Sequence, residues 1–217
     1  MIPRAAALAV ARRRCLAANV ELILPDDPRR VAVVGLVAAA HSIIGTGVTS
    51  EHVSQYVTVT LPGAPGAASM ALALIPVVGR FLAQLGAQNG RTAIYLSPAA
   101  LDHITATVEH ELGHAGTIAA GGLVWCGVYA LSPEARAGGE APCYGAGMAV
   151  DVADGKPVDD AARDALLSLG SYGLDADAAA LAASIIASAR ETIRATGDFG
   201  GIVAEVRSEL AKEGVAW

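Results

Sequence analysis

Residues 97–116 read SPAALDHITATVEHELGHAG, and this stretch decides how the rest of the chain is interpreted. Ser97 is a good helix N-cap and Pro98 suits the first helical position. The sequence therefore predicts a helix over residues 99–116. The preceding segment, Arg91–Leu96, is short and apolar and predicts a strand that leads into this helix.

Two histidines and a glutamate in the predicted helix form the pattern His-Glu-x-x-His. His110 and His114 are four residues apart, so they share a helix face and can bind one zinc ion together. Glu111 projects from the neighbouring side, where it can reach a zinc-bound water as a general base. The pattern predicts Zn²⁺ as cofactor. The alternatives are a structural metal site and a solvent-facing His-Glu-His surface without a metal.

A catalytic zinc ion takes three protein ligands and leaves one position for water. No histidine follows His114, so the third ligand is expected to be an acidic residue downstream. Glu140 is favoured, because a chain break at Gly138-Gly139 is expected to let Glu140 open a new helix that runs to Ala153. Glu134 is the second choice. The full set of candidates is Glu134, Glu140, Asp151 and Asp154.

The segment from His110 to Met148 resembles the gluzincin type of metallopeptidase. It is similar to small bacterial and phage-encoded proteins that pair His-Glu-x-x-His with a downstream Glu-Ala-x-x-Tyr helix. The matching blocks are His110-Glu111-x-x-His114, Tyr129–Pro133 and Glu140-Ala141-Pro142-Cys143-Tyr144, with Ile94–Pro98 upstream. The resemblance implies a zincin-like unit that hydrolyses peptide bonds in a peptide or protein substrate, with Glu140 as the third zinc ligand.

The predicted chemistry assigns further roles. Zinc acidifies its water and polarises the scissile carbonyl, and Glu111 carries the proton to the leaving amine. Tyr144 is the preferred oxyanion donor, with Tyr129 and Tyr172 as alternatives; each could instead be a partly buried core tyrosine. The carboxylate that orients one histidine is either Glu109 or Asp151. Cys143 could face the site or be a small buried apolar residue.

Composition excludes several classes of protein. Of the 217 residues, 53% are hydrophobic and 17% are charged, which excludes a disordered chain. Three cysteines are too few for a disulfide scaffold, and a net charge of −6 gives no general attraction to nucleic acid. The uncharged stretch at 115–131 is expected to be a packed wall behind the metal and not a membrane span. No convincing signal peptide is found, which predicts cytoplasmic synthesis.

The predicted fold class is α+β, mostly α, with a zincin-like catalytic unit, a small sheet with an edge strand, and a C-terminal helical bundle. The predicted division is a helical lead-in over 1–30, a metallopeptidase domain over 31–155 and a C-terminal helical region over 156–217. A strand is predicted over 53–61, and either a strand or a helix over 31–40. The remaining predictions are a turn at 62–65, a helix at 70–88, a turn at Asn89-Gly90, and helices at 158–170, 175–196 and 200–213.

A second function fits the same composition. The chain could be a structural or assembly protein, such as a phage virion component, that retains a metallopeptidase fold with little or no activity. Its alanine-rich helices would then contact assembly partners. The presence of Glu111 favours the enzyme, because a purely structural metal site needs no general base.

Overall fold

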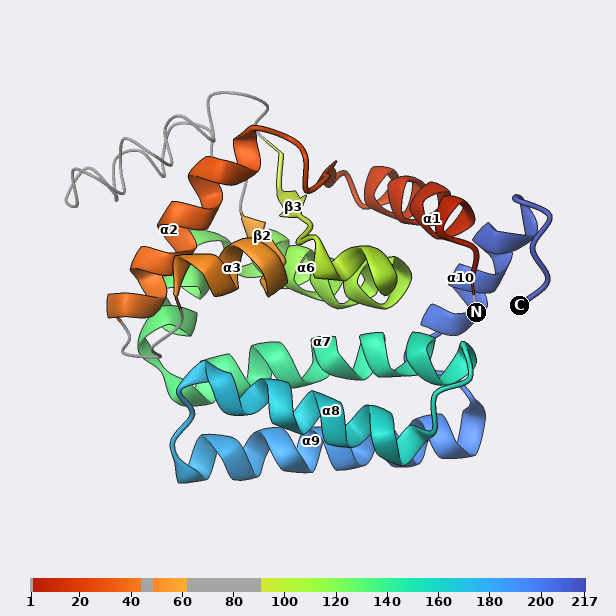
Figure 1. Cartoon of the computed structure of the whole chain (residues 1–217). Coiled ribbons are helices and arrows are strands. Elements are labelled where there is room, and N and C mark those ends of the chain that lie inside the picture. Colours follow the sequence, from red (N-terminus) through yellow and green to blue (C-terminus); the bar gives the residue numbers. More distant parts are fainter. Residues whose placement is uncertain (1, 44–48, 62–90) are drawn as a thin grey trace.

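The computed structural model describes residues 2–43, 49–61 and 91–217 (Figure 1). The turn predicted at 62–65, the helix predicted at 70–88 and the turn predicted at Asn89-Gly90 lie outside the described residues. The described part is mostly helical with one small sheet, which confirms the α+β, mostly α class. The elements in chain order are α1 (Arg4–Ala17), β1 (Glu21–Ile23), α2 (Arg29–Ile43), α3 (Ser50–Tyr56), β2 (Val59–Leu61), β3 (Ala93–Tyr95), the 3₁₀ helix η1 (Ala99–Asp102), α6 (Ile104–Leu131), α7 (Pro133–Ala153), α8 (Val158–Leu169), the 3₁₀ helix η2 (Gly170–Tyr172), α9 (Ala176–Thr196) and α10 (Ile202–Ala211).

The sheet has three short strands in the order β1-β3-β2. The central strand β3 pairs in parallel with β1 and antiparallel with β2, so that Ile94 lies opposite both Leu22 and Thr60. Ile94 is fully buried and packs in a cluster with residues of α1 and α6, including Val108. The sheet therefore holds the N-terminal half of α6 in place. The strand predicted at Arg91–Leu96 is confirmed, whereas β1, inside the predicted helical lead-in, was not predicted.

The strand predicted over 53–61 is wrong for its first half, because Ser50–Tyr56 form helix α3. Thr49 caps this helix by accepting a hydrogen bond from the backbone of His52. At the other end the buried guanidinium of Arg30 donates to the carbonyls of Val53, Ser54 and Val57, and also to that of Leu96 in the sheet region. Arg30, which is distant in sequence, thus supplies the hydrogen bonds that the last carbonyls of α3 lack within the helix. The undecided segment 31–40 is helical, within α2.

The helix break predicted at Gly138-Gly139 is also wrong, since α7 runs unbroken from Pro133 to Ala153. Ser132 caps it by accepting from the backbone of Ala135 at 3.1 Å. Gly139 is there for close packing, because a Cβ at this position would lie 2.9 Å from a ring carbon of Trp125 in α6. Gly138 and Pro142 both lie on the exposed side of α7, where water can satisfy the carbonyl that proline leaves unpaired.

Helix α6 is longer than predicted and is kinked. The hydroxyl of Ser97 accepts a hydrogen bond from the backbone of Ala100 in η1 at 3.2 Å, and α6 itself begins at Ile104. Gly122 has φ 57° and ψ −148°, a conformation open to glycine, and it changes the direction of the helix. After the kink, Trp125 and Tyr129 pack toward α7, while Leu131 is exposed. The uncharged stretch at 115–131 is thus only partly a buried wall, and no described helix is long and apolar enough to cross a membrane.

The C-terminal helices α8, α9 and α10 confirm the three that were predicted. Helices α7, α8 and α9 each pack against the other two and form a three-helix bundle (Figure 1), joined by a core rich in alanine. Helix α10 lies outside this bundle and packs against α1, where Arg13 and Arg14 form ion pairs with α10 glutamates. The two ends of the described chain therefore meet beside α6.

Candidate metal centre

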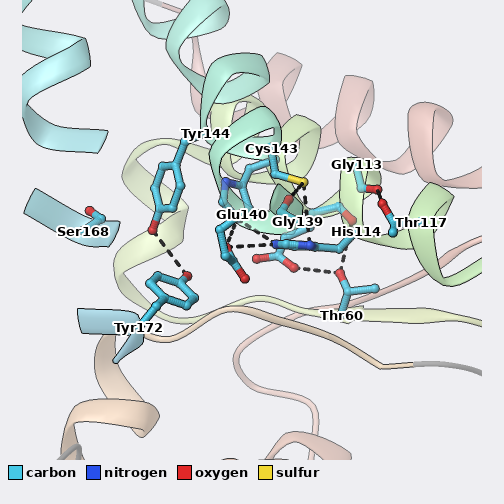
Figure 2. Close-up of polar contacts among 12 residues, drawn as sticks. Thr60, Gly113, His114, Thr117, Gly139, Glu140, Cys143, Tyr144, Ser168 and Tyr172 are labelled. Carbon is cyan, nitrogen blue, oxygen red and sulfur yellow. Dashed lines mark hydrogen bonds and ion pairs between the residues drawn. The ribbon is translucent and has the colours of Figure 1, made fainter. Parts of the chain in front are cut away.

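The functional candidates meet where α6 packs against α7, a contact that we call the α6–α7 seam. His110 and His114 lie on successive turns of α6, and Glu140 lies on the facing side of α7. The helices approach closely because glycine stands at their contacts: a Cβ on Gly113 would lie 2.7 Å from the sulfur of Cys143. Figure 2 shows the carboxylate of Glu140 directed at the ring of His114.

Three potential ligand atoms of the seam form a nearly equilateral triangle. The Nε2 atoms of His110 and His114 are 3.1 Å apart, and Oε2 of Glu140 is 3.5 Å from the first and 3.2 Å from the second. A tetrahedral zinc ion with bonds of about 2.0 to 2.1 Å requires ligand atoms separated by about 3.3 Å. The triangle has the size of one face of that tetrahedron. Within the described residues these three side chains form the only cluster able to hold a metal.

Glu140 is a buried carboxylate that pairs with no lysine or arginine of the described residues. It is 3% exposed, and its Oε2 accepts no hydrogen bond from any described residue. Burial alone would raise the pKa of Glu140, but the positive charges that His114 and His110 can carry lower it well below its usual value. Burial likewise lowers the pKa of His114, and the charge of Glu140 outweighs it and raises that pKa well above its usual value. Each group thus stabilises the charged form of the other.

The other oxygen of Glu140 is occupied. The hydroxyl of Tyr129, from the part of α6 beyond the kink, donates a hydrogen bond to Oε1 of Glu140. Burial and the charge of Glu140 raise the pKa of Tyr129 well above its usual value, so this phenol remains a donor. Arg136 of α7 fixes the same region by donating to the backbone carbonyls of Tyr129 and Tyr172.

Tyr144 lies beside the histidines, as predicted. Its ring meets that of His110 edge to face, with centroids 4.4 Å apart, and its hydroxyl lies 3.4 Å from the hydroxyl of Tyr172. Burial raises the pKa of Tyr144 to about 12, so its phenol keeps its proton at neutral pH. Of the three tyrosines predicted as possible oxyanion donors, Tyr144 lies against His110, Tyr172 meets Tyr144, and Tyr129 lies on the other oxygen of Glu140.

Glu111 is held by the sheet. It is 5% exposed, and the hydroxyl of Thr60 in the edge strand β2 lies 2.7 Å from its Oε2 and 3.2 Å from its backbone carbonyl. This hydroxyl fixes the carboxylate relative to the two histidines. Sequence reasoning missed Thr60, because 51 residues separate it from Glu111 and only strand pairing brings it near.

A sulfur atom stands where a metal-bound histidine usually has an oxygen partner. Sγ of Cys143 lies 3.6 Å from Nδ1 of His114, on the ring edge opposite Glu140, and donates to the carbonyl of Gly139 at 3.1 Å. Cys143 therefore does face the site. Neither carboxylate that was expected to orient a histidine does so: Glu109 pairs with Arg14, and Asp151 pairs with Lys156 at 3.3 Å.

The other candidates for the third ligand have partners elsewhere. Glu134 accepts from the hydroxyl of Ser132 at the exposed start of α7. Asp154, at the far end of α7, accepts from the indole of Trp217 at 3.1 Å. Of the four candidates, the structure brings only Glu140 to the two histidines.

Comparisons with protein-family models, curated proteins and solved structures find no match to this chain. The metallopeptidase resemblance therefore remains a prediction that rests on the residues described above.

Proposed function

We propose that this protein is a zinc-dependent hydrolase of peptide bonds, with His110, His114 and Glu140 as zinc ligands and a zincin-like arrangement around them. The observation that carries the proposal is the position of the buried Oε2 of Glu140. This oxygen accepts no hydrogen bond from the described residues and faces the Nε2 atoms of both histidines at distances that suit a zinc ion. Two imidazoles and one carboxylate are a donor set of catalytic zinc sites, which leave a fourth position open.

When bound, zinc supplies a Lewis acid that polarises the scissile carbonyl and acidifies water. Glu111 is the general base: its carboxylate accepts the proton of the attacking water and passes it to the leaving nitrogen. Thr60 keeps the Glu111 carboxylate oriented through the hydrogen bond to Oε2. Tyr144, which remains protonated, is the proposed donor to the oxyanion of the substrate.

The test combines metal analysis with one substitution. Elemental analysis of the purified protein should find one zinc per chain. Glu111→Gln should retain this zinc and lower turnover of a peptide panel by about 10²- to 10⁴-fold, since the general base is lost. Glu134→Gln is the matched control, because Glu134 lies at the exposed start of α7, and it should retain both zinc and turnover. Absence of stoichiometric zinc would refute the proposal.

A non-enzymatic assembly role is the second candidate, and one observation favours it. Leu167 of α8 is 71% exposed, and Leu166 of α8 and Leu181 of α9 are about 40% exposed. Exposed large apolar side chains mark a protein contact surface where they form a contiguous patch. If zinc binds but Glu111→Gln changes turnover of no peptide in the panel, the assembly role is the better interpretation.

A further inference from the structure

The two oxygens of the Glu140 carboxylate have different surroundings. Oε2 faces the histidine nitrogens and accepts no hydrogen bond from the described residues. Oε1 points to the other side and accepts the hydrogen bond from the hydroxyl of Tyr129. A carboxylate can bind a metal through one oxygen or through both, so what occupies the second oxygen decides which mode is open.

Tyr129 is itself held firmly in place. Its backbone carbonyl accepts from Arg136 at 3.3 Å, and its ring packs beside Trp125, with centroids 6.4 Å apart. Both aromatic rings sit over Gly139, where a Cβ would lie 3.5 Å from a Tyr129 ring carbon. A bulkier residue at this position would push both rings away from α7. The donor to Glu140 is thus built into the packing of the seam.

The kink at Gly122 lies between the two histidines and Tyr129 along α6. His110 and His114 precede it on α6, and Tyr129 follows it. One helix therefore approaches Glu140 twice, with the two histidines on one oxygen of the carboxylate and the phenol on the other.

We propose that Tyr129 is a positioning residue that restricts Glu140 to coordination through Oε2 alone and so keeps the fourth zinc position open. This inference rests on the zinc site proposed above. The hydrogen bond to Oε1 occupies one of its lone pairs and holds that oxygen turned toward Tyr129, away from the position of a second zinc–oxygen bond. Without it the carboxylate can rotate and bind through both oxygens, or move away from the ion.

The experiment compares Tyr129→Phe, which keeps the ring, with Tyr172→Phe. Tyr172 is a partly buried tyrosine of the same region whose hydroxyl lies 3.4 Å from that of Tyr144. Zinc affinity is measured by competition with a chromophoric chelator. Loss of an outer partner of a metal ligand costs about 10- to 100-fold in affinity, and this loss is expected for Tyr129→Phe. Tyr172→Phe should stay within about twofold of the wild-type protein, because its hydroxyl does not contact a metal ligand.

A spectroscopic measurement distinguishes positioning from a general loss of stability. Visible absorption of the cobalt(II)-substituted protein weakens when coordination rises from four to five. A weaker band is expected for Tyr129→Phe and an unchanged band for Tyr172→Phe. In a Glu140→Gln background, Tyr129→Phe should lower zinc affinity no further, because its effect passes through the carboxylate.

Two results are decisive and distinguishable. If the wild-type protein binds zinc, and Tyr129→Phe binds it equally well with the same cobalt spectrum, the role of Tyr129 is refuted while the zinc site stands. If the wild-type protein binds no zinc, the proposed function falls and this inference falls with it.

Discussion

Two glutamates of the molecule are equally buried, at 3% exposure, and their surroundings differ completely. Glu109 lies where α1, α6 and α10 meet, and both its oxygens accept hydrogen bonds from Arg14 at 2.7 Å. Glu140, in the α6–α7 seam, faces two imidazoles and a phenol. The first region carries its own permanent cation. In the second, the described residues place only histidines within ion-pair distance of the carboxylate, which is why we propose metal binding for Glu140 and a structural role for Glu109.

The largest expected effect is on zinc affinity, which should depend on Glu140 and not on Glu109. Glu140→Gln should lower zinc affinity by on the order of 10²- to 10³-fold, because one of four ligands is lost from a binding energy of about 10 to 16 kcal/mol. Near pH 6 the metal-free variant should unfold at a lower denaturant concentration, since protonated His114 has lost the carboxylate that stabilises its charge. Chelator competition and urea unfolding measure the two quantities. A Glu140→Gln protein with wild-type zinc affinity would show that Glu140 is not a zinc ligand.

The converse substitution should act on stability alone. Glu109→Gln leaves the guanidinium of Arg14 without its main partner and should lower the free energy of unfolding by about 2 to 4 kcal/mol, with zinc affinity within about twofold of wild type. Urea unfolding is the measurement. Glu205→Gln is the matched control, because Glu205 also contacts Arg14 but is exposed, and it should cost less than about 1 kcal/mol. Equal losses from the two variants would show that burial of Glu109 does not matter.

The sequence predicted the parts of this comparison that depend on local spacing. His110, Glu111 and His114 share a helix by their spacing alone, and a downstream acidic ligand follows from the absence of any later histidine. The structure brings Glu140 to the site even though the helix break that favoured it does not exist. Gly138-Gly139 predicts a break from local sequence alone, because the packing role of Gly139 depends on Trp125, a residue of another helix.

Contacts between distant segments could not be predicted in this way. Thr60 reaches Glu111 through strand pairing, Tyr129 reaches Glu140 across a kink, and Arg30 converts a predicted strand into a capped helix. Each depends on where a distant element folds, and nothing in the local pattern encodes that. The sequence predicts Tyr129 as an alternative oxyanion donor, whereas in the structure its hydroxyl donates to the carboxylate of Glu140.

The smallest expected effect is a pH dependence of the metal-free protein. The folded pKa of His114 is raised, so its stabilising contribution is complete below the ordinary histidine value of 6.5 and fades as pH rises through the folded value. The folded pKa of Glu140 is lowered, so its contribution is present above the ordinary value of 4.5 and is lost as pH falls further. The seam should therefore stabilise the metal-free fold most between pH 4.5 and 6.5.

Urea unfolding of the metal-free protein from pH 5 to pH 9 tests this expectation. Stability should decline above neutral pH, by about 1 kcal/mol or more. Glu140→Gln is the control: it should flatten the decline, because His114 loses the charge that holds its proton, whereas Glu109→Gln should not. With saturating zinc the slope should reverse, since zinc binding needs unprotonated His114. A wild-type profile identical to that of Glu140→Gln would show that the pair does not titrate as described.

All three side chains proposed as ligands come from two consecutive helices, α6 and α7. Contacts between segments that are close along the chain form early in folding, because little loop entropy is lost in closing them. The ligand set is therefore complete in the nascent chain once residue 153 has been synthesised, before α8, α9 and α10 exist. A cation bound at that stage would hold α6 against α7. Helices α8, α9 and α10 would then pack against two helices that are already in place.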